Sequence, residues 1–219
     1  SRGLGDVYKR QVHSLVDRVL DVPPLRQWRQ NRFDADFRAG GYGGTCRGVF
    51  ASYAECAAAA PKTLPLGYDN DAAAHMYRDR LHRLYPGDYP MLLWLHKALE
   101  EGGHRVFDLG GHVGVAYYAY QRLVPFPEDL VWQVHDVPAV MEVGRALAQG
   151  KDASGRLSFV DSFDAAADAD ILFTSGCLQY LEQTLAQRLQ ALPRRPRWLL
   201  VNLLPPVSYA HLRAHETEA

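Results

Sequence analysis

The chain has 219 residues, of which 47% are hydrophobic, and its 24 Lys and Arg nearly balance its 25 Asp and Glu, giving a net charge of −1. This length supports one well-buried core, so we expect a single domain with at most a small accessory region. The balanced charge disfavours nucleic acid and anionic membrane as partners. No apolar run approaches the roughly 18 residues that span a bilayer. With no secretory signal pattern visible, we expect a cytoplasmic protein.

The cysteines carry little information about chemistry. Cys46, Cys56 and Cys177 form neither an even disulfide set nor a C-x-x-C pair. We therefore expect no metal site, and a reducing compartment agrees with this usage.

The two ends of the chain stand apart from its hydrophobic pattern. Residues 1–11 (SRGLGDVYKRQ) and 207–219 (VSYAHLRAHETEA) resemble translated sequencing-adapter read-through. We predict that both are non-native tails, that the natural protein continues past Pro206, and that the fold is truncated at its C-terminal side.

Residues 12–103 are expected to form a helical N-terminal region that acts as a lid or substrate-binding part. Apolar residues recur at helical spacing and proline or glycine clusters separate the segments. The expected helices are a stretch in 12–20, an amphipathic stretch through Trp28, Phe33 and Phe37, and helices over 53–60, over 71–84 and from Met91 onward.

Residues 104–206 alternate between apolar strands and helices. The expected strands are 105–109, 130–135, 157–160, 171–174 and 198–204, with helices over 113–123, after Asp136 and over 178–192. Such β-α repeats require right-handed crossovers and a buried, mostly parallel sheet. The sequence therefore predicts a Rossmann-like, doubly wound α/β domain.

The segment from Val106 to Gly114 (VFDLGGHVG) is a strand, a glycine turn and the start of a helix. Glycines allow a ligand to approach the main chain, and a helix start offers unpaired N–H groups. This arrangement is typical of a site for a nucleotide-like cofactor. A dinucleotide fingerprint needs G-x-G-x-x-G, but the offsets from Gly110 place His112 and Val115 where two of the glycines belong, so the dinucleotide interpretation is weak.

The loop resembles the first motif of class I S-adenosylmethionine-dependent methyltransferases, D-x-G-x-G-x-G. Asp108, Gly110 and Gly114 are in register, and His112 stands at the middle glycine, where Gly111 supplies conformational freedom. The resemblance implies that S-adenosyl-L-methionine is the cofactor and that this loop wraps its methionine part.

Ligands of open α/β sheets bind beyond the carboxyl ends of the strands. Polar residues stand at four of these ends: Asp108, Asp136, Asp161 with Ser162, and Ser175. The resemblance implies that Asp136 binds the ribose hydroxyls and that Asp161 contacts the adenine amino group. The alternatives are that Asp136 caps the next helix, that Asp161 caps a strand end, and that Asp108 only orders the loop.

Longer segments resemble a narrower group. The runs VFDLGGHVGVAYYAY, VWQVHDVPAVMEVG, ADILFTSGCLQYL and WLLVNLLPP are similar to a bacterial family of methyltransferase-like proteins of undemonstrated substrate, often found among genes for surface-glycan assembly. The similarity covers roughly residues 15–206. It implies methyl transfer to a small-molecule or glycan-precursor acceptor.

No residue stands out as a catalytic base. His112 lies at the mouth of the expected site, but a loop-ordering role is the alternative. Gln179 and Tyr180 occupy the place where many small-molecule methyltransferases keep a catalytic histidine. A degenerate methyltransferase fold with a binding or partner role, and a nucleotide-binding Rossmann oxidoreductase, therefore remain as alternatives.

Overall fold

The computed structural model describes residues 22–39, 48–60, 69 and 78–204. Both expected tails, the expected helix in 12–20 and the first half of the expected helix over 71–84 lie outside these residues. Pro65–Pro206 forms one compact unit, and the described residues before it belong to a second unit.

The second unit contributes two described helices, α2 (Pro23–Arg38) and α3 (Tyr53–Ala59). Proline at the first positions of α2 starts this helix, because its fixed φ suits the first turn and its missing N–H needs no partner there. Ser52 caps α3 by accepting a hydrogen bond from the Glu55 N–H. Helix α2 contains no buried residue; of its expected apolar face, Trp28 is 57% exposed, while Phe33 and Phe37 are half-buried and their rings contact each other.

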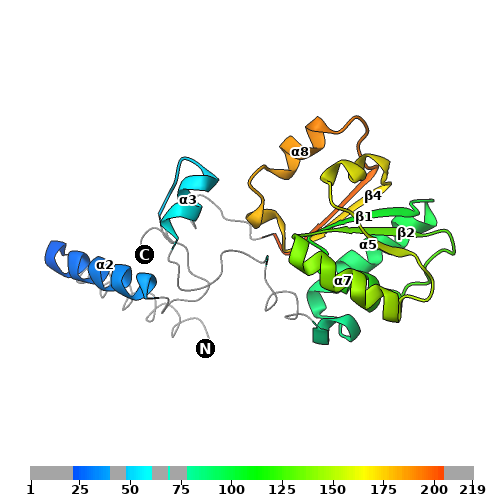
Figure 1. The fold of residues 1–219 in the computed structure, drawn as a ribbon, viewed down its shortest axis with the longest axis horizontal. Helices are drawn as coiled ribbons and strands as arrows, with labels where there is room; N and C mark the ends of the chain where they lie inside the picture. The colour runs from blue at the N-terminus through cyan, green and yellow to red at the C-terminus, as the bar shows by residue number, and fades with distance from the viewer. Residues whose placement is uncertain (1–21, 40–47, 61–68, 70–77, 205–219) are drawn as a thin grey trace, which may run out of the picture. The chain divides into compact units, whose positions relative to one another are not determined.

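The larger unit is built on a five-stranded sheet (Figure 1). Its strands are β1 (Arg105–Leu109), β2 (Val131–His135), β3 (Leu157–Phe159), β4 (Ile171–Ser175) and β5 (Trp198–Asn202). The strand order is β3-β2-β1-β4-β5, and all four neighbouring pairs are parallel. This is the Rossmann-like order, which reverses direction between β1 and β4. The predicted fold class is confirmed.

Helical segments cover both faces of the sheet. One face carries α5 (Tyr89–Glu100), α6 (Val115–Tyr120) and α7 (Pro138–Lys151), and the other carries η3 (Phe163–Asp168), η4 (Leu178–Tyr180) and α8 (Leu185–Ala191). Successive side chains of a strand point to opposite faces. Accordingly, Val106 belongs to the first apolar cluster, which lies between the sheet and α5, α6 and α7. Phe107 belongs to the second, which lies between the sheet and η3, η4 and α8.

Three of the elements that differ in extent from the prediction do so for a clear local reason. Helix α6 begins two residues later than expected, because Gly114 has a left-handed backbone (φ 89°) that a helix cannot include. The single helix expected over 178–192 is divided, because Thr184 and Gln187 form a capping box that starts α8. Strand β5 ends at Asn202, and Leu203 has a φ of 49°.

Helix α5 packs on the sheet rather than standing apart from it. Met91, Leu95 and Leu99 are buried in the first apolar cluster. Two short 3-10 segments precede this helix, η1 (Arg78–His82) and η2 (Pro86–Asp88), and Asn202 of β5 donates a hydrogen bond to the Gly87 carbonyl. The described segment before β1 is therefore part of the core of this unit.

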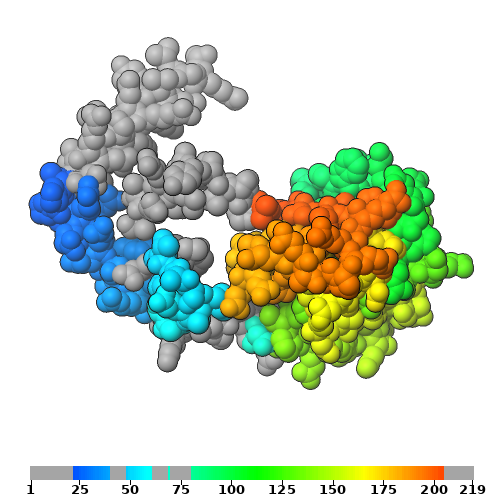
Figure 2. All heavy atoms as spheres, turned by 90° about the horizontal axis from the view of Figure 1, so that it is seen from above, coloured from blue at the N-terminus to red at the C-terminus, as the bar shows by residue number. Residues whose placement is uncertain are grey.

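Strand β5 lies at the edge of the sheet within the described residues. Its side chains Leu199 and Val201 are 48% and 40% exposed, and the segment that contains β5 is orange-red in Figure 2. Within the described part of the chain, no helix is both long and apolar enough to cross a membrane.

Candidate functional site

The loop after β1 has an unusual backbone. Gly110, His112 and Gly114 have φ values of 71°, 56° and 89°, all in the left-handed region that favours glycine. The Gly110 N–H donates a hydrogen bond to the His135 carbonyl, which holds the loop against the end of β2. Three left-handed residues within five produce the tight turn that the glycine pattern predicts.

Two of the glycines are required by close packing. A Cβ atom at Gly110 would collide with the side chain of Cys177, and one at Gly111 would collide with the carboxylate of Asp108. A larger residue at either position would displace the groups beneath the loop. The loop therefore lies directly on the ends of β1 and β4.

Asp108 is a buried acid below this loop, with 1% of its surface exposed. Its Oδ2 accepts a hydrogen bond of 3.1 Å from the Trp132 indole. Burial raises the pKa of Asp108, the Trp132 hydrogen bond opposes this rise and the nearby Asp136 carboxylate adds to it, so that the pKa is about 7. Asp108 therefore changes charge near neutral pH.

Asp136 joins two backbone segments. Its Oδ2 accepts from the His112 N–H over 2.8 Å, and its Oδ1 accepts from the Val137 N–H over 2.7 Å. The expectation that Asp136 caps the following helix is corrected, because the N-cap of α7 is Val137 and no side chain caps it. The carboxylate instead fixes the loop after β1 relative to the segment after β2.

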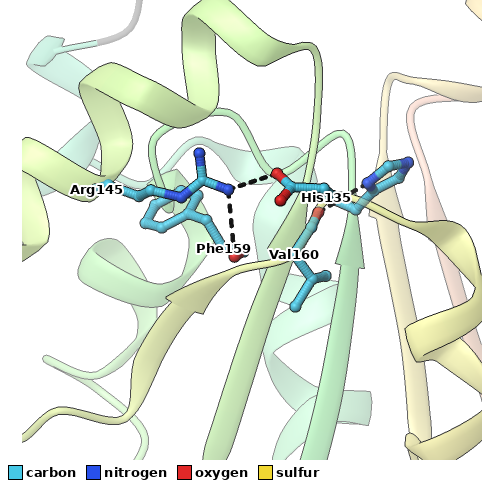
Figure 3. A network of polar contacts seen from close by, with 5 residues as sticks. His135, Arg145, Phe159 and Val160 are labelled. Atoms are coloured by element: carbon cyan, nitrogen blue, oxygen red, sulfur yellow. Dashed lines mark hydrogen bonds and ion pairs between the residues drawn. The ribbon is translucent and has the colours of Figure 1, made fainter.

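The polar groups after β3 bind to their neighbours (Figure 3). Arg145 of α7 forms an ion pair of 2.6 Å with Asp161, whose side chain is 80% exposed, and it also reaches the Phe159 carbonyl. Nδ1 of His135 lies 2.9 Å from the Val160 carbonyl oxygen, so this nitrogen carries the proton. Strand β3 is thereby fastened to both α7 and β2.

Ser162 occupies the cap position of η3, where it accepts a hydrogen bond from the Asp164 N–H. The adenine contact predicted for Asp161 and the cofactor-binding role predicted for Ser162 remain predictions. The side chain of Asp161 is accessible for it, and the ion pair with Arg145 fixes its direction.

The segment after β4 supplies a residue that the sequence analysis did not select. Ser175 is paired in register with Asn202, and Gly176 turns the chain with a φ of 71°. Cys177 then packs on Gly110, and burial raises the pKa of its thiol to about 12, with the carboxylates of Asp136 and Asp108 adding to the increase. The sequence pattern does not predict a role for Cys177, because its place in the site depends on the approach of the loop after β4 to the loop after β1.

Gln179 and Tyr180 are both exposed. The Gln179 amide donates to the Gly176 carbonyl over 2.8 Å, and Tyr180 is 54% exposed. Gln179 thus stabilises its own turn. Neither side chain has the buried setting that tunes a general base.

His112 is buried to 7% exposure, and its backbone N–H serves Asp136. This contact agrees with the loop-ordering alternative for His112. The structure brings the segments after β1, β2 and β4 together, since Gly110 packs against Cys177 and the His112 N–H donates to Asp136.

Searches of protein-family models and of curated proteins found no match. Among solved structures, an O-methyltransferase family protein from Burkholderia thailandensis is 24% identical over 52% of this chain and 35% of that chain, with a TM-score of 0.36. A SAM-dependent methyltransferase from Thiobacillus denitrificans, in complex with S-adenosyl-L-homocysteine, is 23% identical over 70% of this chain and 62% of that chain (TM-score 0.42).

A third structure, described as an S-adenosyl-L-methionine-dependent methyltransferase from Methanococcus maripaludis, is 12% identical over 58% of this chain and 59% of that chain (TM-score 0.41). The chain spans about a third of the length of the Burkholderia protein and about three fifths of the other two. These partial likenesses leave the function to be argued from the site itself.

Proposed function

We propose that this chain carries the cofactor-binding domain of an S-adenosylmethionine-dependent methyltransferase. The observation that supports this best is the position of the glycine loop between two carboxylates. Gly111 lies against Asp108, and His112 donates its N–H to Asp136. Within the described residues, Asp108 forms no ion pair and has no cation among the groups that set its pKa.

This charge distribution favours a cation-bearing ligand. A carboxylate in a site of low polarity is stabilised by a positive group within a few ångströms. S-adenosylmethionine carries a sulfonium and an ammonium, whereas a dinucleotide would bring an anionic pyrophosphate to the same loop. The absence of the second and third fingerprint glycines in the sequence agrees with the first ligand.

Each predicted residue then has a proposed role. Gly110, Gly111 and Gly114 give the methionine part access to the main chain, and Asp108 provides negative charge below it. Asp136 has lone pairs left on both oxygens and accepts from the ribose hydroxyls. The contact with the adenine amino group is proposed for Asp161, and Ser162 and Ser175 are proposed as further cofactor-binding residues at the ends of β3 and β4.

The cofactor would supply an electrophilic methyl group on its sulfonium. The loop from Gly110 to Gly114, with Asp108 and Asp136, would hold this group while an acceptor oxygen or nitrogen bonds to the methyl carbon. The electrons of the broken carbon–sulfur bond would stay on sulfur, and the proton of the acceptor would pass to solvent. The chain's own residues contribute orientation, which alone provides much of the rate of such a displacement. The acceptor is proposed to be a small molecule or a glycan precursor.

A second function is a degenerate methyltransferase fold that binds the cofactor without transferring its methyl group. The observation that favours it is the hydrogen bond of Gln179 to Gly176, because this amide stands where a catalytic base would be expected. In this case the domain would act through a partner.

An assay with S-adenosylmethionine that carries a tritiated methyl group separates the two functions, by measuring transfer of this methyl group to small-molecule and glycan extracts. The proposed methyltransferase yields a labelled acceptor, and the Gly111→Ala variant yields none. If the protein binds the cofactor and no extract becomes labelled, the degenerate alternative is supported instead.

A further inference from the structure

Asp108 is surrounded by groups that do not balance its charge. Its side chain points to the face of the sheet that carries α6, it accepts one neutral hydrogen bond from Trp132, and Gly111 closes the space above it. Within the described residues no Arg or Lys pairs with it. An ionised carboxylate in this position is short of hydrogen-bond donors and of positive charge.

Among the described residues, the titratable groups that face Asp108 come from three neighbouring segments. Asp136 follows β2, Tyr120 comes from α6, and Cys177 follows β4. Burial holds the pKa of the Tyr120 phenol far above its usual range, and that of the Cys177 thiol rises to about 12. Neither group therefore changes charge between pH 6 and pH 8. Asp136 accepts two backbone hydrogen bonds, and His112 is the other titratable residue in the loop.

We propose that Asp108 makes this site selective for the sulfonium form of the cofactor over the thioether product, by releasing its proton when a cation binds. The inference rests on the proposed function. When the site is empty, Asp108 holds a proton because, within the described residues, its buried carboxylate has one neutral hydrogen-bond donor and no cationic partner. A sulfonium above the loop supplies the missing positive charge, so the O–H bond of Asp108 breaks and the proton passes to the buffer.

S-adenosylhomocysteine has the same adenosine and amino acid parts but lacks the sulfonium charge. The pKa of Asp108 is therefore lowered less in the complex with S-adenosylhomocysteine than in the complex with S-adenosylmethionine. A pKa of about 7 for the empty site places the transition within an accessible range of pH. Above this range the wild-type protein holds a full negative charge below the cofactor, which favours the charged substrate and assists release of the uncharged-sulfur product.

The experiment measures dissociation constants for S-adenosylmethionine and S-adenosylhomocysteine by calorimetry from pH 5.5 to pH 8.5. In the wild type, the preference for the sulfonium form is expected to grow about tenfold over this range, which corresponds to one unit of difference in the Asp108 pKa between the two complexes. Repeating the titration in two buffers with different ionisation enthalpies shows proton release with the sulfonium form.

Three variants make the test specific. Asp108→Asn mimics the protonated acid and keeps an acceptor for Trp132, so its preference is expected to be independent of pH. Trp132→Phe removes a hydrogen bond that lowers the pKa of Asp108, so the midpoint of the pH profile moves upward. The control Glu142→Gln removes an exposed carboxylate on α7 and keeps the wild-type profile.

A fourth variant, His112→Asn, removes the titratable histidine from the loop and is also expected to keep the profile. A wild-type preference that does not change with pH, or one that changes equally in Asp108→Asn, overturns the inference while the proposed function stands. A wild type that binds neither ligand overturns the proposed function and the inference with it.

Discussion

The His112 N–H donates a hydrogen bond to Oδ2 of Asp136 over 2.8 Å, which ties the loop after β1 to the carboxyl end of β2. The second oxygen of the same carboxylate accepts from Val137. The Asp136 side chain thus holds together the two loops at the carboxyl ends of β1 and β2. The geometry of the candidate site depends on this side chain.

Replacement of Asp136 by Ala is expected to lower the free energy of unfolding by about 2 to 4 kcal/mol, because two backbone N–H groups lose a charged acceptor. Binding of S-adenosylhomocysteine is expected to weaken more than tenfold. The matched control is Asp161→Ala, which removes an exposed ion pair and should cost less than about 1 kcal/mol. Urea denaturation measures the free energy of unfolding of both variants. Equal losses of stability in Asp136→Ala and Asp161→Ala would contradict the role given to Asp136.

Gly111→Ala tests the close contact between the loop and Asp108. Its new Cβ collides with the carboxylate, so a loss of about 1 to 3 kcal/mol in stability is expected, together with loss of cofactor binding. Gly150→Ala is the control, because nothing lies within 4 Å of a Cβ added there in α7. This control is expected to be neutral or stabilising by up to about 1 kcal/mol. Thermal unfolding of both variants measures the difference, and an undisturbed Gly111→Ala protein would contradict the packing.

Asp108→Asn tests the buried acid through stability. The pKa of Asp108 rises from 3.8 to about 7 on folding, so the protonated acid favours the folded state at low pH and this contribution is lost as pH rises through 7. Relative to Asp108→Asn, the wild type is expected to lose roughly 4 kcal/mol between pH 4 and pH 8. Urea midpoints across this range measure the loss. A constant difference between the two proteins would show that Asp108 does not titrate near 7.

Position 112 tests whether backbone geometry or side-chain chemistry matters. Asn tolerates the left-handed region, so His112→Asn is expected to stay within about 1 kcal/mol of the wild type and to keep cofactor binding. A β-branched residue is strained there, and His112→Val is expected to lose about 1 to 3 kcal/mol. Circular dichroism and calorimetry measure these effects. Loss of methyl transfer in His112→Asn with full cofactor binding would instead assign the histidine to catalysis.

The sheet was predictable because its signals are local. The strands begin and end within one residue of their predicted limits, except that Leu203 and Leu204 fall outside β5. Buried parallel strands read as continuous apolar runs between turn residues. The glycine loop was also predictable, since its left-handed positions include Gly110 and Gly114.

The contacts within the site depend on tertiary structure and were less predictable. Sequence spacing places Asp108 and Asp136 at the same edge of the sheet, yet it cannot show that Asp136 bonds to the His112 backbone. The pairing of Asp161 with Arg145 and the approach of Cys177 to Gly110 arise from segments that meet only after folding. Helix limits near 178–192 were missed because a capping box competes with continued helical periodicity.

The central claim is that the carboxyl ends of β1 and β2, at Asp108 and Asp136, bind S-adenosylmethionine. Calorimetric titration of the purified chain with S-adenosylhomocysteine and, separately, with NAD tests it most directly. The account predicts saturable binding of one S-adenosylhomocysteine per chain, weakened more than tenfold in Asp136→Ala, and no binding of NAD. Saturable NAD binding with no response to S-adenosylhomocysteine would contradict it.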